Sequence, residues 1–281
     1  MITVFIGKNK LAKICIIVII IYMKIAIIGA GAFGTALGGI LASKGYDVDY
    51  YDSRIEREKL SDVIEGSKYV VLCVPSKAVP YVLPYLPQDK ALVVATKGIL
   101  SDKTFVKFDD YMVLSGPGFA DDIKAGKRTK LTATDKRVEE LFTTDFLSFD
   151  ATNDRRGVLM CGALKNVYAI LAGMLNLQPG SKEHERYLAE VADEMRSLLS
   201  ANGADAKTVD LECGVGDLRL TCAMPSRNYE FGQMLHKNPD AKPEKTVEGV
   251  SALKRIKRGE IVVPDTAKKM HQLITESNKW A

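Results

Sequence analysis

The sequence predicts an α/β protein with a doubly wound parallel, Rossmann-like sheet followed by an all-helical second domain. Up to about residue 152, short apolar runs alternate with helical segments, a pattern typical of a parallel sheet covered by helices. A glycine-rich motif over residues 29–34 follows the first apolar run, and after residue 152 helical runs dominate to the end. The 281 residues suffice for one large or two modest domains. We therefore predict a dinucleotide-binding domain over 23–152 and a helical domain over 153–281.

The strands of the first domain are expected where apolar residues stand together and end at a glycine, a proline or a polar turn. Residues 32–44 have helical composition and stop at Gly45. A short charged helix is expected over 54–66. The expected strands are 24–28, 48–51, 69–74, 91–95 and 111–114, with 130–133 and 146–149 extending the sheet. The clearest helices of the second domain are 154–177, 182–202, 228–237, 248–257 and 265–276.

Residues 1–22 look like the basic and apolar parts of a signal peptide, because three lysines precede the apolar run 14–22. That run is shorter than the ~20 apolar residues that cross a bilayer. No small-residue cleavage site follows it. We expect an upstream extension rather than a membrane anchor or a signal peptide, and no membrane span.

Composition narrows the class of protein. The net charge is +4 and the basic residues are scattered, which does not favour nucleic acid but weakly suits anionic small molecules. The five cysteines include no Cys-x-x-Cys pair, so we predict a reducing, cytoplasmic compartment. The three histidines stand far apart without metal-ligand spacing, and no metal site is expected.

The glycine motif has the context that makes G-x-G-x-x-G meaningful, since it follows a predicted strand and opens a predicted helix. Gly29 permits the tight turn, Gly31 lets the backbone approach a pyrophosphate, and Gly34 lets helix and strand pack closely. The free N–H groups of the helix N-terminus would then meet the phosphates. The alternative is a glycine turn that serves packing alone.

Asp52 ends the second predicted strand, where a carboxylate binds the ribose hydroxyls of NAD and repels the 2′-phosphate of NADP. Arg54 and Arg57 stand close enough to reverse that preference. The sequence favours NAD slightly over NADP, and a turn aspartate is the alternative for Asp52.

Lys165 is the only charged residue between Gly157 and Ser181. A lysine buried in such a run loses solvation of its ammonium, so its pKa falls toward neutrality and it becomes a candidate proton donor and acceptor. The alternative is a lysine whose charged end reaches the surface along an apolar face.

Two further segments carry candidate site residues. Residues 214–217 place the Asp217 carboxylate on a flexible turn, from which it could orient a lysine; a helix cap is the alternative. Ser226, Arg227 and Asn228 stand where a new helix should begin, after Pro225. A helix start with an arginine and two neutral hydrogen-bonding side chains suits a phosphate, and a surface capping segment is the alternative.

Taken together, these residues resemble bacterial-type NAD(P)-dependent sn-glycerol-3-phosphate dehydrogenase. The likeness runs in chain order from Met23 to about Pro264. No single stretch is decisive, but nine in order across two domains are highly specific. The matching stretches are 28–37, 74–76, 95–98, 115–120, 162–167, 214–218, 220–222, 226–228 and 247–249.

The resemblance implies reversible reduction of dihydroxyacetone phosphate to sn-glycerol 3-phosphate for phospholipid synthesis, and a homodimer. By position, Lys165 looks like the general acid/base and Lys97 like a second lysine that contacts substrate and nicotinamide. The other substrate positions it implies are Gly116, Gly118, Asp217, Ser226, Arg227 and Asn228. The cofactor positions it implies are Ala32, Phe33, Ala120, Arg227 and Glu248, beside Lys97, the three motif glycines and Asp52.

The chain departs from the family pattern at Gly118, where a serine or threonine is usual, and in shortened connections after Asp52 and Gly98 and a shortened C-terminal tail. These departures motivate an alternative, a dinucleotide-binding protein of this family with impaired catalysis. A different two-domain hydroxyacid or sugar-acid dehydrogenase is disfavoured by the segments 214–217 and 226–228.

Overall fold

The structure, a computed structural model, describes residues 23–54, 59–243 and 245–280. Within this part, one sheet of seven strands has the order β2-β1-β3-β4-β5-β6-β7. Its strands are β1 (Lys24–Ile28), β2 (Asp47–Tyr51), β3 (Tyr69–Leu72), β4 (Ala91–Val94), β5 (Tyr111–Ser115), β6 (Thr129–Ala133) and β7 (Leu147–Ala151). The predicted α/β class with a doubly wound sheet is confirmed.

One pairing in the sheet differs from the prediction. Strands β2, β1, β3, β4 and β5 pair in parallel, but β5 and β6 are antiparallel, with Ser115 opposite Thr132. Strand β7 is then parallel to β6. The only α-helix in the connection from β5 to β6 is α4 (Ala120–Lys124), and its five residues are too few for the helix that usually spans the sheet in a parallel crossover.

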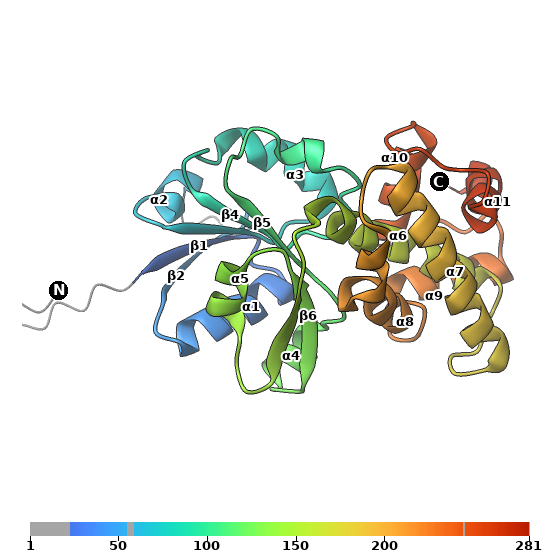
Figure 1. Cartoon of the computed structure of the whole chain (residues 1–281), viewed down its shortest axis with the longest axis horizontal. Helices are drawn as coiled ribbons and strands as arrows, with labels where there is room; N and C mark the ends of the chain where they lie inside the picture. The colour runs from blue at the N-terminus through green and yellow to red at the C-terminus, as the bar shows by residue number, and fades with distance from the viewer. Residues whose placement is uncertain (1–22, 55–58, 244, 281) are drawn as a thin grey trace, which may run out of the picture.

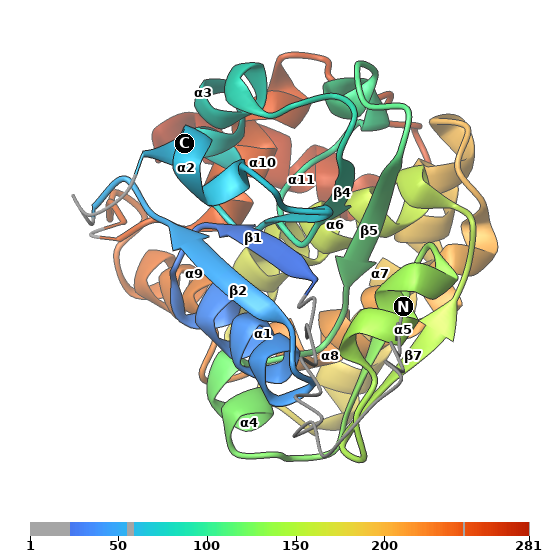
Figure 2. The same cartoon turned by 90° about the vertical axis from the view of Figure 1, so that its left-hand side faces the viewer.

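Helices cover both faces of the sheet, as Figures 1 and 2 show. The alternation along β1 decides which side chain faces which layer, because successive strand residues point to opposite faces. Ile25 and Ile27 pack with α1, α4 and α5, whereas Ala26 and Ile28 belong to the core that continues into the helical half. The helices of this half are α1 (Ala32–Ser43), α2 (Leu60–Ile64), α3 (Val79–Val82), α4 (Ala120–Lys124) and α5 (Lys136–Phe142).

Beyond β7 the described chain is helical, and Figure 1 shows these helices packed at one end of the sheet half. They are α6 (Arg155–Met174), α7 (Lys182–Ala201), α8 (Asp217–Thr221), α9 (Arg227–Lys237), α10 (Glu248–Lys257) and α11 (Lys268–Glu276). A π-helical turn, η5 (Glu212–Gly216), leads directly into α8. The last strand ends at Ala151 and α6 begins at Arg155, while the domain boundary at 152 stays a prediction.

Helix α6 is the centre of the helical half. Every residue from Gly157 to Gly173 is buried, including Lys165. In length and hydropathy α6 could cross a membrane, but 94% of its most apolar window is buried inside the protein. It is therefore a core helix, enclosed by α7, α8, α9, α10 and strand β5.

The sequence patterns located the long elements within a few residues and missed the short ones. Helices α3, α4, α5 and α8 were not expected, since each has seven residues or fewer and too little periodicity to detect. The expected helix over 54–66 is observed only as Leu60–Ile64, and part of that range lies outside the described residues. The predictions for residues 1–22 and for Arg57 also lie outside them.

Candidate active site

The amine of Lys165 lies against a carboxylate in the protein interior. Its Nζ donates a hydrogen bond of 2.6 Å to Asp217 Oδ1 and one of 2.7 Å to Thr221 Oγ1. Lys165 is 3% exposed and Asp217 1%. The charged end of Lys165 therefore does not reach open solvent in this structure, which removes the surface-lysine alternative.

Lys97 joins the same carboxylate from the sheet half. Its Nζ donates to Asp217 Oδ2 at 3.0 Å and to the carbonyl of Gly116 at 2.9 Å. The Phe33 ring lies 5.9 Å from this ammonium. The loop that carries Lys97 is held from the helical half, because Arg255 Nη1 donates to the Gly98 carbonyl at 2.7 Å. One carboxylate thus bridges two lysines that are far apart in the sequence.

Burial and charge set the protonation of Lys165. Loss of solvation lowers the pKa of the Lys165 amine to about 8, Asp217 opposes that shift by stabilising the ammonium, and the positive charge of Lys97 adds to it. The amine can therefore carry or lack its proton near neutral pH, as a general acid/base must.

Asp217 is more rigidly placed than the sequence suggested. The prediction of a flexible turn is wrong, because residues 212–216 form η5 and Asp217 is the first residue of α8. The Asp217 N–H donates to the Glu212 carbonyl, the five-residue spacing of a π-helix. Thr221, one helical turn later, donates to the Asp217 carbonyl at 2.6 Å while it accepts from Lys165.

The glycine loop fits a dinucleotide. Gly29 has φ +108°, and an added Cβ would lie 2.8 Å from the Cys73 backbone. A Cβ on Gly34 would lie 2.0 Å from the Gly29 carbonyl oxygen. At Gly31, which caps α1, a Cβ would meet no protein atom within 4 Å. The protein itself does not require a glycine at 31, and the open space suits a pyrophosphate at the helix N-terminus.

Asp52 follows β2 and forms an ion pair with Arg54. The guanidinium donates from Nε at 2.8 Å and from Nη2 at 2.6 Å to the two carboxylate oxygens. These hydrogen bonds lower the pKa of Asp52 to about 2, and the N–H of Ala30 in the glycine loop adds to the shift. A fixed anion therefore stands beside the glycine loop, with its arginine already engaged.

The three residues at the start of α9 differ in their surroundings. Ser226 is the N-cap and is buried, whereas Arg227 is exposed. Asn228 is buried, its Nδ2 donates to Asn166 Oδ1, and its Oδ1 accepts from the Gly249 N–H, each at 2.9 Å. The amide of Asn228 thus ties α9 to α6 and α10, and its predicted contact with a substrate stays a prediction.

The remaining expected positions surround the same region. Gly116 and Gly118 follow β5, and Ala120 begins α4. Glu248 opens α10 and accepts a hydrogen bond of 2.6 Å from Ser76 of the sheet half. Their predicted contacts with substrate and cofactor stay predictions.

Three contributors were given no role from the sequence, although they stand in the matching stretches 74–76, 162–167 and 220–222. Thr221 contacts Lys165, Asn166 contacts Asn228, and Ser76 contacts Glu248. Local spacing gave a signal for Thr221 alone, because a residue four positions after Asp217 lies on the same side if the segment is helical. The other two depend on packing between segments far apart in the sequence.

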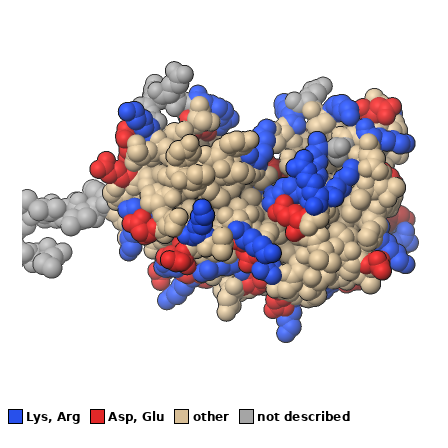
Figure 3. Space-filling model, turned by 90° about the horizontal axis from the view of Figure 1, so that it is seen from above, with Lys and Arg blue, Asp and Glu red and all other residues tan. Residues whose placement is uncertain are grey.

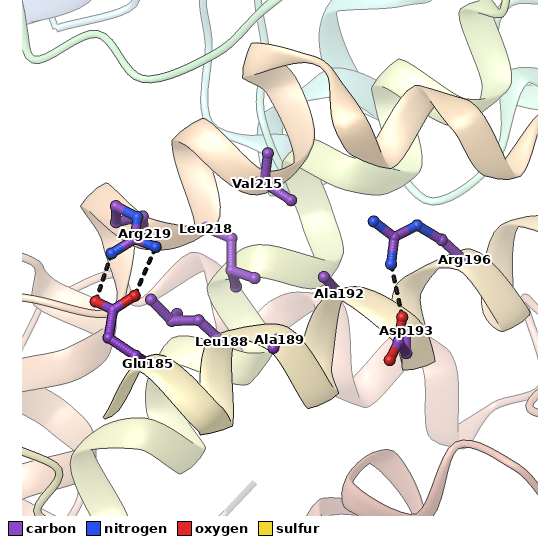
Figure 4. A pocket seen from close by; sticks show the side chains of 9 residues that line it. All are labelled: Glu185, Leu188, Ala189, Ala192, Asp193, Arg196, Val215, Leu218 and Arg219. Atoms are coloured by element: carbon purple, nitrogen blue, oxygen red, sulfur yellow. Dashed lines mark hydrogen bonds and ion pairs between the residues drawn. The ribbon is translucent and has the colours of Figure 1, made fainter. Parts of the chain in front are cut away.

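A hollow of about 330 Å³ lies between α7 and the segment formed by η5 and α8. Figure 4 shows Leu218 lining it, with the ion pairs of Arg219 with Glu185 and of Arg196 with Asp193 toward its two ends. Neither catalytic lysine candidate lines it.

Figure 3 shows charges of both signs on the face viewed from above, with Lys and Arg gathered over the helical half.

Comparison with known proteins identifies the family. The model for the C-terminal part of NAD-dependent glycerol-3-phosphate dehydrogenase matches residues 154–278. The glycerol-3-phosphate dehydrogenase [NAD(P)+] of Maridesulfovibrio salexigens is 31% identical over 290 residues, covering 83% of this chain and 87% of the relative. That of Citrifermentans bemidjiense is 33% identical over 259 residues, covering 74% and 77%.

A solved structure supports the fold. Glycerol-3-phosphate dehydrogenase from Coxiella burnetii superposes with a TM-score of 0.77 at 24% identity, covering 92% of this chain and 96% of that chain. The predicted family is confirmed by the two relatives, which align over most of their own length as well as most of this chain. The chain belongs to the NAD(P)-dependent glycerol-3-phosphate dehydrogenases.

Proposed function

We propose that this protein interconverts dihydroxyacetone phosphate and sn-glycerol 3-phosphate with NAD or NADP, and so supplies glycerophospholipid synthesis. The observation that carries the mechanism is the chain Lys165–Asp217–Lys97, in which two amines from the two halves share one buried carboxylate. A ketone reduction needs one proton donor and one fixed positive charge at the carbonyl oxygen, and this arrangement offers both.

Lys165 donates the proton. Its pKa of about 8 keeps most of it protonated at neutral pH, which suits reduction of the ketone. In the oxidative direction the neutral amine accepts the proton from the alcohol, and this form grows as pH rises through the pKa. Asp217 orients the amine, and Lys97 stabilises negative charge as it develops on the substrate oxygen.

The phosphate of the substrate is assigned to the start of α9. Arg227 is exposed, so its guanidinium can bind the dianion through two parallel hydrogen bonds, and Ser226 stands at the helix N-terminus. Asn228 fixes the position of α9 through its hydrogen bonds with Asn166 on α6 and Gly249 on α10. Binding at this remote group positions the carbonyl near Lys165.

The dinucleotide is assigned to the glycine loop, with Gly31 beneath the pyrophosphate and Asp52 toward the adenosine ribose. We favour NAD over NADP, because Asp52 carries a fixed negative charge and Arg54 is already bound to it. The bound cofactor supplies or accepts the hydride. Phe33, Ala120 and Glu248 are assigned to its remaining contacts.

The test is steady-state oxidation of NADH and NADPH by purified protein, with dihydroxyacetone phosphate as substrate and unphosphorylated dihydroxyacetone as the matched control. We expect turnover that requires the phosphate and is faster with NADH. Folded protein that binds either cofactor without turnover would contradict the proposal and favour the catalytically impaired alternative.

Two finer assignments belong to the same proposal. We place the protein in the cytoplasm, since Cys73, Cys161, Cys213 and Cys222 are free thiols, as is usual in a reducing compartment. We also propose a homodimer, which the family likeness favours. Sedimentation of the full chain tests the second assignment, and a monomer at assay concentration would contradict it.

A further inference from the structure

The segment that carries Asp217 belongs to the helical half, but its first N–H groups are held by side chains of the sheet. The N–H of Cys213 donates to Thr132 Oγ1 at 2.9 Å, and the N–H of Glu212 donates to Asp150 Oδ2 at 3.1 Å. Thr132 and Asp150 are direct neighbours on β6 and β7. The two strands therefore present adjacent acceptors to consecutive N–H groups at the start of η5.

The first N–H groups of a helix have no partner within the helix, so they need acceptors from elsewhere. At η5 the nearest residues along the chain supply no capping side chain. Thr132 is 0% exposed and Cys213 is 0% exposed. Without the threonine oxygen, the N–H of Cys213 would stay buried without a partner, which is costly enough to move the segment.

A rigid path leads from these acceptors to the reacting groups. The Glu212 carbonyl accepts the Asp217 N–H, and α8 begins at Asp217 without a break. Asp217 then binds Lys165 at 2.6 Å and Lys97 at 3.0 Å. A displacement of η5 must therefore change both contacts of the carboxylate.

We infer that Thr132 is a positioning residue for the proposed reaction, a role that rests on the proposed function. Its hydroxyl oxygen holds the start of η5, and through η5 it sets the place of Asp217 between the two lysines. The sheet half, which is assigned to the cofactor, thereby fixes the carboxylate of the helical half. Thr132 itself touches neither lysine, and Asp150 has the same role through the neighbouring N–H group.

The charged surroundings of Lys165 give this role a measurable signature. Asp217 on α8 stabilises the ammonium, Lys97 from the sheet half destabilises it, and the thiol of Cys222 stands at the end of α8. His184 on α7 lies nearby, with its Nε2 atom 3.0 Å from the carbonyl oxygen of Cys222. If Asp217 withdraws, the ammonium loses its main stabilising partner, and the pKa of Lys165 falls.

The experiment compares wild type with Thr132→Val, Thr132→Ser and Thr134→Val in the full chain. Thr134 is the matched control, because it too is a buried threonine whose Oγ1 accepts a backbone N–H, that of Val113 at 2.8 Å, but this bond stays within the sheet half. Reduction of dihydroxyacetone phosphate is followed by NADH oxidation across the pH range around the pKa of Lys165.

We expect Thr132→Val to lower kcat about tenfold, since small misplacements of catalytic groups are costly. The alkaline limb of its plot of kcat against pH, where reduction is lost as Lys165 deprotonates, should move to lower pH. Thr132→Ser keeps the acceptor and should restore both values, and Thr134→Val should leave both near wild type. NADH affinity, measured by fluorescence titration, should be unchanged in every variant.

Each outcome decides something. If Thr132→Val has the same kcat and the same alkaline limb as Thr134→Val, the positioning role is overturned. Wild type without turnover contradicts the proposed function instead, and a crystal structure of Thr132→Val then decides the positioning role by the Asp217–Lys165 distance. If Thr132→Val does not fold, the partly exposed Asp150 is replaced by alanine; a limb at lower pH supports the role, and an unmoved limb overturns it.

Discussion

The two lysines that share Asp217 come from regions of opposite character. Lys165 stands in the middle of α6, where 17 consecutive residues are buried, and its side chain is 4% exposed. Lys97 stands in the loop after β4, with 25% of its side chain exposed. Burial in the first region moves a pKa to about 8, which suits the proton donor that we propose there. The second region keeps its amine beside Phe33, where the proposed mechanism uses it as a fixed charge.

This contrast separates two roles that one residue type can fill. In α6 the side chain is buried and its amine is held by Asp217 and Thr221, so the proposed proton transfer leaves the nitrogen in place. The loop after β4 is held by bonds across the two halves, chiefly Lys97 to Asp217 and Arg255 to Gly98. Five substitutions test this difference between the two regions, in order of decreasing expected effect.

Replacing the buried amine should have the largest effect. Lys165→Met removes the proton donor and keeps most of the side-chain volume, so kcat for reduction should fall by roughly 10²- to 10⁴-fold. NADH affinity should stay near that of wild type, because Lys165 belongs to the helical half. Rapid single-turnover kinetics would measure the chemical step, and a chemical step as fast as that of wild type would remove Lys165 from its role.

Replacing the partly buried amine of Lys97 should cost less and should also move the pH profile. Lys97→Ala removes a stabilising charge, so kcat should fall by roughly 10²- to 10³-fold. Because the Lys97 charge lowers the pKa of Lys165, its removal should raise that pKa. Reduction requires the protonated amine, so the alkaline limb of kcat should move to higher pH. An alkaline limb that stays in place would show that the two amines do not interact.

Arg227→Ala tests the phosphate end of the helical half. A charge-assisted hydrogen bond contributes about 1.5–3 kcal/mol, so KM for dihydroxyacetone phosphate should rise by roughly tenfold to a hundredfold. Activity toward unphosphorylated dihydroxyacetone, if measurable in wild type, serves as the control and should not change. An unaltered KM for the phosphorylated substrate would reject the assignment of Arg227.

Asp52→Ala tests the cofactor side of the sheet half. Loss of the carboxylate removes repulsion of a 2′-phosphate and frees Arg54 to bind it. The ratio of kcat/KM for NADPH to that for NADH should rise about tenfold or more, since like charges in contact cost several kcal/mol. The substrate KM is the internal control, and an unchanged cofactor ratio would contradict the role of Asp52.

Gly118→Ser should have the smallest effect. An added Cβ would lie 3.2 Å from both Ile123 Cδ1 and Leu131 Cδ2, so two flexible side chains must give way slightly. We expect the midpoint of thermal unfolding to fall by about 2–4 °C. If the new hydroxyl reaches the substrate, KM should fall about threefold. A higher KM would show that the glycine is matched to the shape of this site.

The fold and the site were not equally predictable from the sequence. The strand at Lys24–Ile28 and the helix after it follow from a local apolar run and a local glycine motif, so their bounds were nearly correct. Asp217 was predicted on a flexible turn because η5 and α8 are too short to show periodicity. The roles of Thr132 and Asn166 depend on contacts across 62 or more positions of the chain, which no local pattern encodes.

The burial of α6 has a consequence for how this enzyme can change. The same helix carries the proposed proton donor and forms the middle of the hydrophobic core, so packing and the proposed chemistry depend on the same residues. A substitution that loosens the neighbouring apolar layer also admits water beside Lys165. The ammonium is then better solvated, and the pKa of Lys165 rises toward that of free lysine. Selection for heat tolerance in that layer would, by the same reasoning, retune the pH at which the enzyme works.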